Sequence, residues 1–455
     1  MSLAMIKYLS PLALGLCALP FVTTAAFAEA PDAVSDAVSQ DRLRADVEAL
    51  VGFGTRHTLS SQTDARRGIG AARRWAEDKF RASSKACGGC LEIATPETMV
   101  SGSRIPDPVR LVDVVAIQRG TERPNEVVIV QGHIDSRASD VMDAKSDAPG
   151  ANDDGSGTAL VLEAARVLSQ HKFPTTIVYA ALSGEEQGLF GGKLLADYAT
   201  QQGWTVKAVL NNDIVGGSCG SDGYCDDTHV RLFSDGARAD ATDETRAAAR
   251  RFGGENDSPG RNLSRYITGL ADGVQDDLDV RQIWRADRMG RGGDQLPFLE
   301  HGYPAVRFTV AVEDYEHQHQ DLRTEDGVTY GDTVDEMDFP YLAKVTRLNV
   351  ASLAELAKAP MPPAPKADAA VKTWTDVTWQ PVPGAVSYNL WKRRTTAAGW
   401  EAEPVVAGTE MTHAKLDGLR GDDWIIGVSS VAADGSESPI AAAVPGGGFR
   451  PLEQK

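Results

Sequence analysis

The feature that most constrains the fold is a regular alternation of two kinds of segment between residues 109 and 213. Short apolar runs typical of buried strands occupy residues 112–117, 127–130, 176–182 and 206–211. Apolar positions at helical spacing occupy residues 155–168 and 189–198. Strands that alternate with helices predict an α/β domain with a mixed, mostly parallel twisted sheet and helices on both faces. In such a domain, binding groups collect in loops at the carboxyl ends of the strands.

Further segments extend this domain on both sides. Helical patterns occupy residues 41–51, 68–80 and 339–356, and a last apolar strand occupies residues 305–310. Because 455 residues exceed what one core usually organises, a second, smaller domain is expected.

The first 28 residues have the composition of an export signal. Lys7 supplies the positive start, residues 12–22 are apolar, and Ala26, Phe27 and Ala28 form a small-x-small cleavage site. The apolar run falls short of the roughly 20 residues of a membrane-spanning helix, so no stable membrane insertion is expected after cleavage. We therefore expect an exported protein, either periplasmic or secreted.

A proline-rich stretch at residues 359–366 predicts a stiff linker between two domains. After it, short alternating segments separated by turn signals predict a small β-sandwich. The expected organisation is a signal peptide at residues 1–28, a first domain at 29–358, the linker at 359–366, the sandwich at 367–447 and a tail at 448–455.

Four cysteines follow the expected signal peptide, in two close pairs: Cys87 with Cys90, and Cys219 with Cys225. An even number of cysteines in an exported chain predicts disulfide bonds. For Cys87 and Cys90, the alternative is a redox pair or half of a zinc site, but the sequence has no second pair of this kind to complete a structural zinc site.

The formal net charge of −18 argues against a nucleic-acid partner. Solubility alone explains this acidity, although an acidic field could also draw cationic peptides toward a cleft. The sequence indicates no obligate protein partner.

Side chains that can bind a metal ion follow the predicted strands. They are His133 and Asp135, Asp153 and Asp154 in a glycine-rich turn, Glu185 and Glu186, Asp213, and finally His317 and His319. Each motif has a structural explanation when taken alone, such as a helix N-cap for the glycine-rich turn. Their joint occurrence at successive strand ends predicts one metal centre.

The mixture of histidine and carboxylate favours zinc over magnesium or calcium, which prefer oxygen ligands. If one aspartate bridges two ions, each ion also receives a histidine and a carboxylate of its own, which suits two-metal hydrolysis. Adjacent glutamates at a strand end can face different ways, so one of Glu185 and Glu186 can bind metal while the other activates water.

At these residues the chain resembles the co-catalytic zinc aminopeptidases of peptidase family M28, over residues 41–356. The resemblance implies the zinc-dependent exopeptidase fold and two Zn²⁺ ions held by His133, Asp153, Glu186, Asp213 and His319. It implies that Asp153 bridges the ions and that Glu185 is the general base. Asp135 would orient the ring of His133, and the peptide bond between Asp153 and Asp154 would be cis.

The last ligand is a choice between two histidines. In the family this ligand is commonly followed by a Thr and, shortly after, an Asp. Here Gln320 and Asp321 follow His319, so the resemblance favours His319 over His317.

A second departure lies in residues 291–298, which are similar to the family's Ser-Asp-His-x-Pro-Phe segment but carry Gly293 and Gln295 in place of the Ser and the His. A serine that could assist a tetrahedral intermediate is therefore missing. Arg288 or Arg291 could supply the lost donor, or both could be solvated surface arginines.

The C-terminal segment resembles a fibronectin type III domain through Trp379, residues 384–391, residues 426–431 and residues 436–438. We prefer a spacer role to a carbohydrate- or substrate-binding role, because a fold does not imply a function.

Together these features imply an exported metallo-aminopeptidase that removes N-terminal residues from peptides. The alternatives are another two-zinc exopeptidase such as a carboxypeptidase, an amide deacylase, or a non-catalytic receptor-like homologue.

Overall fold

The computed structural model describes residues 34–274 and 276–452. The expected signal peptide at residues 1–28, and residues 453–455 of the expected tail, lie outside the described residues. None of the helices in the described ranges is long and apolar enough to cross a membrane.

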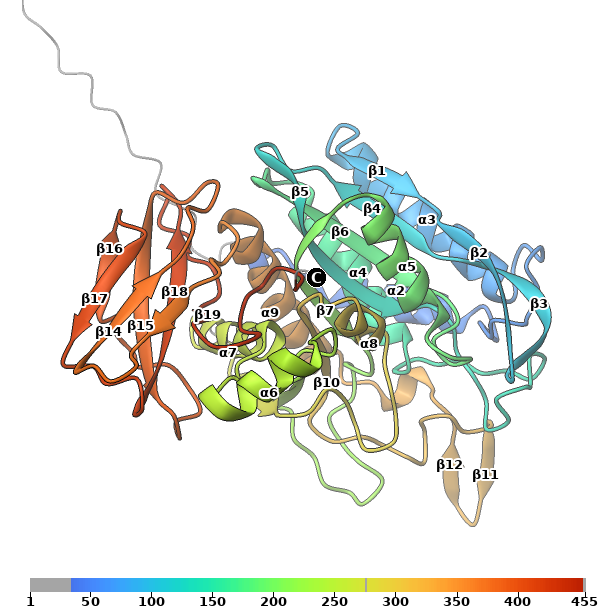
Figure 1. The fold of residues 1–455 in the computed structure, drawn as a ribbon. Coiled ribbons are helices and arrows are strands. Elements are labelled where there is room, and N and C mark those ends of the chain that lie inside the picture. Colours follow the sequence, from blue (N-terminus) through green and yellow to red (C-terminus); the bar gives the residue numbers. More distant parts are fainter. Residues whose placement is uncertain (1–33, 275, 453–455) are drawn as a thin grey trace, which may run out of the picture.

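An eight-stranded sheet forms the centre of the molecule (Figure 1). In spatial order its strands are β1 (Leu91–Ala94), β4 (Val114–Gln118), β6 (Thr175–Leu182), β5 (Arg123–His133), β7 (Thr205–Asn212), β10 (Ala305–Val310), β8 (His229–Ser234) and β9 (Asp279–Ile283). The four central strands β6, β5, β7 and β10 are parallel. β4 and β8 run antiparallel to them. The sheet therefore presents the carboxyl ends of four neighbouring strands at one edge.

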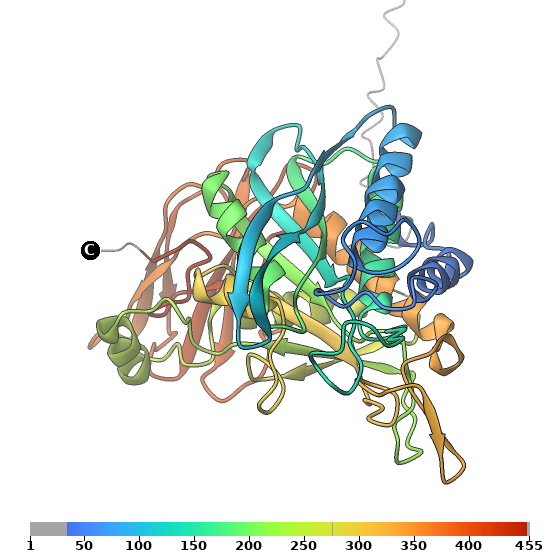
Figure 2. The same cartoon turned by 90° about the vertical axis from the view of Figure 1, so that its right-hand side faces the viewer.

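Helices cover both faces of this sheet. Successive side chains of a strand point to opposite faces, so each central strand contributes to two separate cores. Val128 and Val130 of β5 pack in a core with α2 (Gln40–Val51), α3 (Ile69–Ala86), α4 (Gly155–Leu168), α7 (Pro259–Ala271) and α9 (Phe339–Lys358). Val127 and Ile129 pack with α5 (Phe190–Gln201) and α8 (Gln295–Glu300). Figure 2 shows the blue helices α2 and α3 on one side of the strands and the green α5 on the other. The predicted fold class is confirmed.

One predicted strand is divided in two. Residues 112–117 were expected to form a single strand, but β3 (Ile105–Val112) ends before Asp113 and pairs with β2 (Glu97–Gly102) in a separate hairpin. Asp113 is buried, and its carboxylate accepts a hydrogen bond from the backbone N–H of Ser183 at 2.9 Å. This buried polar contact lies where the chain leaves the hairpin and enters the central sheet.

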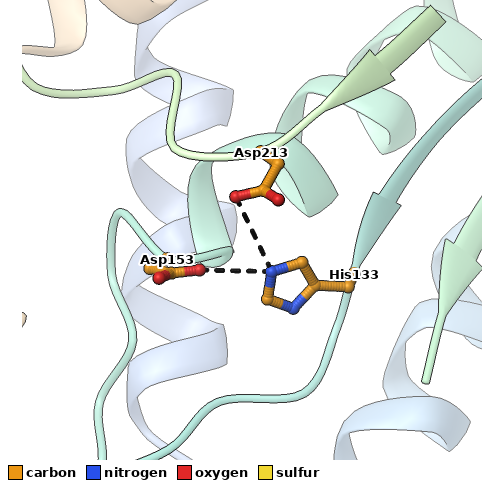
Figure 3. A group of neighbouring side chains, drawn as sticks. All are labelled: His133, Asp153 and Asp213. Atoms are coloured by element: carbon orange, nitrogen blue, oxygen red, sulfur yellow. Dashed lines mark ion pairs between the residues drawn. The ribbon is translucent and has the colours of Figure 1, made fainter. Parts of the chain in front are cut away.

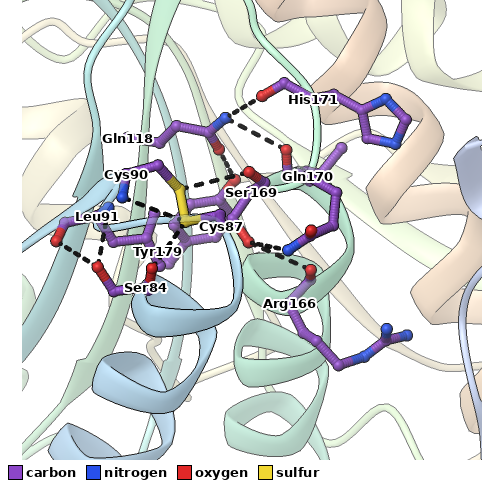
Figure 4. The surroundings of a disulfide bond; sticks show 11 residues. Ser84, Cys87, Cys90, Leu91, Gln118, Arg166, Ser169, Gln170, His171 and Tyr179 are labelled. Atoms are coloured by element: carbon purple, nitrogen blue, oxygen red, sulfur yellow. Dashed lines mark hydrogen bonds between the residues drawn. A yellow bond between two sulfur atoms is a disulfide. The ribbon is translucent and has the colours of Figure 1, made fainter.

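Both predicted disulfides are present. The bond between Cys87 and Cys90 closes the turn from α3 to β1 (Figure 4). Beside it, Oγ of Ser84 donates to the carbonyl of Leu91 at 2.9 Å and accepts from the N–H of Leu91 at 3.2 Å. The disulfide leaves neither sulfur as a thiolate, so this pair does not serve as half of a zinc site.

Two small antiparallel sheets follow the main domain (Figure 1). One contains β13 (Lys366–Asp368), β14 (Trp374–Thr378) and β17 (His413–Asp417); the other contains β16 (Val406–Thr409), β15 (Ser387–Arg394), β18 (Trp424–Val431) and β19 (Ala441–Ala442). Val377, Leu390, Leu416 and Val428 are buried, so each sheet has an apolar face. The expected linker is also packed: Met361 is buried, and its carbonyl accepts a hydrogen bond from Ser430 at 2.6 Å.

A buried carboxylate joins these C-terminal sheets to the main domain. Asp257, just before α7, pairs with Arg393 of β15 and lies 3.4 Å from Arg265 of α7. The three side chains are only 2% to 4% exposed. Arg265 also donates to the carbonyl of Ala398 at 2.7 Å. Because one carboxylate serves guanidinium groups from both parts of the chain, its loss would leave two buried charges without their shared partner.

Asp257→Asn is therefore expected to lower the free energy of unfolding by roughly 3 kcal/mol. The measurement is the urea midpoint, compared with that of Asp243→Asn, whose carboxylate is 95% exposed in a surface pair with Arg246. An unchanged midpoint in Asp257→Asn would show that the two parts are held together by other contacts.

Candidate metal centre

The predicted ligands come from loops that follow the four parallel strands. His133 ends β5, Glu185 and Glu186 follow β6, Asp213 follows β7, His319 follows β10, and Asp153 lies in the turn before α4. Since these strands are neighbours in the sheet, residues up to 186 positions apart in the sequence meet at one edge.

The first group consists of His133, Asp153 and Asp213 (Figure 3). Nε2 of His133 lies 3.2 Å from Oδ1 of Asp153 and 3.9 Å from Oδ1 of Asp213. All three side chains are buried. One nitrogen and two carboxylate oxygens thus face a common point.

The second group consists of Asp153, Glu186 and His319. Nε2 of His319 lies 2.9 Å from Oδ2 of Asp153 and 2.9 Å from Oε1 of Glu186. Asp153 therefore belongs to both groups, with one oxygen facing each histidine. This is the geometry that a bridging carboxylate requires.

His317 takes no part in either group. Its Nδ1 lies 2.7 Å from Asp314, and its Nε2 lies 3.4 Å from Glu336. The residue between the two histidines instead supports the centre, because the amide of Gln318 donates to Oδ2 of Asp153 at 2.8 Å. The structure thus brings His319, rather than His317, to Asp153.

The donor set fits zinc ions. Nε2 of His319 faces two carboxylate oxygens at the same distance, and a single N–H cannot donate well to both. Oε1 of Glu186 is buried and accepts no hydrogen bond from any residue that the structure describes. A cation shared by the imidazole lone pair and the carboxylates would satisfy these atoms, and imidazole with carboxylate is a zinc donor set.

The charges at the centre perturb one another strongly. Burial alone would raise the pKa of Asp153, but His319 and His133 lower that pKa well below its ordinary value. Burial alone would lower the pKa of His319, but Glu186 and Asp153 raise it to about 10. The site is thus a dense group of buried carboxylates that is stabilised by positive charge.

Asp154 stabilises the turn before α4 through two hydrogen bonds. Its carboxylate accepts hydrogen bonds from the backbone N–H groups of Gly157 and His133, both at 2.9 Å. It therefore acts as the N-cap of α4 and fixes the end of β5 at the same time. The peptide bond between Asp153 and Asp154 is cis, as the resemblance implied.

Glu185 lies beside the two groups and lines a solvent-open cavity of about 530 Å³, which Asp153, Glu186, Asp213 and His319 also line. Burial raises the pKa of Glu185 well above its ordinary value. Burial thus favours the neutral form of this carboxyl group more than water would.

Asp135 contacts His133 through its backbone carbonyl as well as through its carboxylate. Nδ1 of His133 lies closer to the backbone carbonyl of Asp135, at 3.0 Å, than to its carboxylate, at 3.6 Å. The carboxylate of Asp135 accepts hydrogen bonds from the backbone N–H groups of Glu185, at 3.3 Å, and Glu186, at 3.2 Å. Asp135 thus connects the histidine with the loop that carries both glutamates.

Two residues of the site were missed by the sequence analysis. The buried Arg307 of β10 lies 3.0 Å from Asp213 and 2.8 Å from Asp287. The carboxylate of Asp332 accepts a hydrogen bond from the backbone N–H of Asp153 at 2.7 Å. Arg307 could have been noticed in the sequence, because it is a charged residue inside an apolar strand. Asp332 lies in a loop without a recognisable sequence pattern.

The structure also shows what replaces the missing serine. A Cβ at Gly293 would lie 2.6 Å from Oε1 of Gln295 and 3.0 Å from a guanidinium nitrogen of Arg307, so the space is filled. Arg288 and Arg291 both line the cavity, but both also pair with Glu313, at 3.1 Å and 2.7 Å. They are neither free surface arginines nor unpaired donors.

Comparison with known proteins places the chain in a family. The profile of "Peptidase family M28" matches residues 113–335. A probable zinc metalloprotease of Pyricularia oryzae is 41% identical over 435 residues, covering 92% of this chain and 86% of that protein. A probable zinc metalloprotease of Leptosphaeria maculans is 41% identical over 424 residues, covering 91% of this chain and 96% of that protein.

Among solved structures, the LapA aminopeptidase of Legionella pneumophila is similar in fold. Its TM-score is 0.53 at 20% identity, with 78% of this chain and 80% of that chain covered. The chain thus agrees with these relatives in sequence over most of its length, and with this structure in fold. The chain belongs to peptidase family M28.

Proposed function

We propose that the protein is an exported aminopeptidase that uses two zinc ions to hydrolyse the N-terminal peptide bond of its substrates. The observation that carries this proposal is the pair of ion-binding groups that share Asp153. Glu185, with its raised pKa, lies beside them on the wall of one cavity. The resemblance to aminopeptidases and the curated relatives named as probable zinc metalloproteases support the same assignment.

In this proposal five side chains hold the ions. His133 and Asp213 would hold one ion, Glu186 and His319 would hold the other, and Asp153 would serve as a ligand to both. When bound, the zinc ions would polarise the scissile carbonyl and make water acidic enough to lose a proton near neutral pH. Asp135 and Asp154 keep the ligand loops in place through the backbone N–H groups described above.

Glu185 would act as the general base and then as the general acid. Its carboxylate takes a proton from the attacking water and later gives that proton to the leaving amine. A raised pKa favours this sequence, because the protonated form must persist until the peptide bond breaks.

We also propose the domain organisation inferred from the sequence, with residues 1–28 as an export signal and residues 367–447 as a fibronectin type III-like module. The buried Asp257 and the packed residue Met361 support a fixed rather than a mobile module. Two disulfides support an oxidising compartment.

The test compares a free-amine substrate with its blocked form. We expect an aminoacyl-p-nitroanilide to be hydrolysed and its N-acetylated form to resist hydrolysis. Preference for the acetylated form would instead favour an amide deacylase, and release of C-terminal residues from a peptide would favour a carboxypeptidase.

Metal removal is a separate prediction. Dialysis against a strong chelator is expected to abolish hydrolysis, because the five ligands would lose the ions that activate water. Activity should return when zinc is added, reaching its maximum at two zinc ions per chain by elemental analysis. A protein that binds no zinc, or keeps full activity without it, would contradict the proposal.

A further inference from the structure

The cavity at the metal centre is lined by positive as well as negative side chains. Besides four carboxylates it is lined by four arginines, Arg104, Arg137, Arg288 and Arg291. This is unexpected for a chain with a net charge of −18. The arginines come from the β2–β3 hairpin, from the loop after β5, and from the segment between β9 and α8.

These arginines fall into two pairs with different partners. Arg288 and Arg291 both pair with Glu313, whose carboxylate also accepts a hydrogen bond from Arg231. In contrast, neither Arg104 nor Arg137 pairs with a carboxylate in residues 34–274 and 276–452. Their guanidinium groups are thus available to an anion in the cavity.

Backbone carbonyls hold both of these available arginines in place. Arg104 donates from Nη1 to the carbonyl of Glu186 at 2.8 Å. Arg137 donates to the carbonyls of Ala138 at 3.1 Å and Ser139 at 2.9 Å. Each guanidinium keeps further N–H donors beyond these contacts. A side chain that is already oriented loses less entropy when it binds a ligand.

A chain of contacts connects the segments that carry the two arginines, which line the same cavity. Arg104 contacts Glu186, and the next residue, Gln187, lines the cavity and lies 3.1 Å from Nε2 of His57. The same ring nitrogen of His57 lies 2.9 Å from the carbonyl of Val141, in the loop that carries Arg137. Gln187 and His57 therefore connect the loop that supports Arg104 with the loop that carries Arg137.

We infer that Arg104 and Arg137 form a carboxylate-binding subsite, which selects short peptides with a negative charge near the scissile bond. This inference rests on the proposed aminopeptidase function. Guanidinium groups bind carboxylates through paired, charge-assisted hydrogen bonds. The carboxylate is either the C-terminus of a dipeptide or the side chain of Asp or Glu on the leaving side of the bond.

The first arm of the test compares kcat/KM for four substrates of the zinc-loaded enzyme: Ala-Ala against Ala-Ala-NH₂, and Ala-Glu-NH₂ against Ala-Gln-NH₂. We expect at least one negatively charged member to be preferred by about tenfold or more, since a charge-assisted hydrogen bond is lost in its neutral partner. The first pair reports a C-terminal carboxylate and the second pair reports a side-chain carboxylate.

In the double variant Arg104→Gln/Arg137→Gln this preference should fall to about onefold, while the kcat/KM for neutral substrates changes little. Arg81→Gln, a surface arginine paired with Glu77, is the matched control and should keep the full preference. Equal kcat/KM values within both pairs in the unaltered enzyme, or a preference that survives in the double variant, would overturn the inference.

Binding separates this inference from the proposed function. Calorimetry with the Glu185→Gln variant measures the Kd of the same four peptides without turnover. Tighter binding of the charged peptides, lost when the two arginines are also replaced, supports the subsite even if none of the four peptides is hydrolysed. Equal Kd values in both pairs would reject the subsite even if the protein is an aminopeptidase.

Discussion

Replacing Glu185 by Gln is expected to lower kcat by roughly a thousandfold while the zinc content stays at two ions per chain. The amide keeps the size of the side chain but can neither accept the proton of the attacking water nor return it to the leaving amine. Glu185 belongs to neither of the two ion-binding groups, although the adjacent Glu186 belongs to one. The substitution should therefore separate catalysis from metal binding.

The measurement combines steady-state hydrolysis of an aminoacyl-p-nitroanilide with elemental analysis of the same sample. Glu92→Gln, which replaces an exposed carboxylate paired with Arg119, is the control and should retain full activity. A Glu185→Gln variant with normal kcat would remove this residue from the mechanism. A variant that loses zinc would show that Glu185 helps to hold an ion.

The local patterns that predicted the centre share one physical property. Strands buried on both faces require long apolar runs, so the polar residue at the end of such a run is conspicuous in the sequence. His133 at the end of β5 and Asp213 just after β7 are of this kind. The side-by-side arrangement of their strands then brings the side chains together, and the sequence predicts this because strands that alternate with helices form parallel sheets.

The remaining parts of the site are not local. Arg307 reaches Asp213 from a neighbouring strand, and its role depends on strand order, which no sequence pattern encodes. The carboxylate of Asp332 accepts hydrogen bonds from the backbone N–H groups of Asn152 and Asp153. Every residue except proline has a backbone N–H group, so these hydrogen bonds do not require particular residue types at positions 152 and 153. They therefore produce no recognisable sequence motif.

The segment between residues 214 and 304 was also not predicted, for a related reason. It forms β8, β9 and α6 (Asp243–Phe252) at the edge of the sheet, as well as α7 and α8. β9 is only partly buried, and Ala249 is the one buried residue of α6. Because β9 and α6 bury few apolar side chains, their sequences lack the apolar runs that mark core strands and helices.

Asp153→Asn is expected to have the second large effect, a loss of at least one zinc ion per chain and a fall in kcat of roughly a thousandfold or more. Oδ1 of Asp153 faces His133 and Oδ2 faces His319, so both oxygens are needed. An asparagine offers only one oxygen and places an NH₂ group where the second ion would bind. The amide would also lose the negative charge that brings two cations close together.

Elemental analysis and hydrolysis should be measured on Asp153→Asn and on Asp147→Asn, a matched control in the same connection between β5 and α4. Asp147 lies outside both groups and pairs at the surface with Arg67, so its variant should bind two zinc ions and keep its activity. If Asp153→Asn retained two ions, the carboxylate could not be the bridge. The two groups would then be independent sites, and the case for two-metal hydrolysis would lose its geometric basis, because that mechanism needs both ions at one substrate bond.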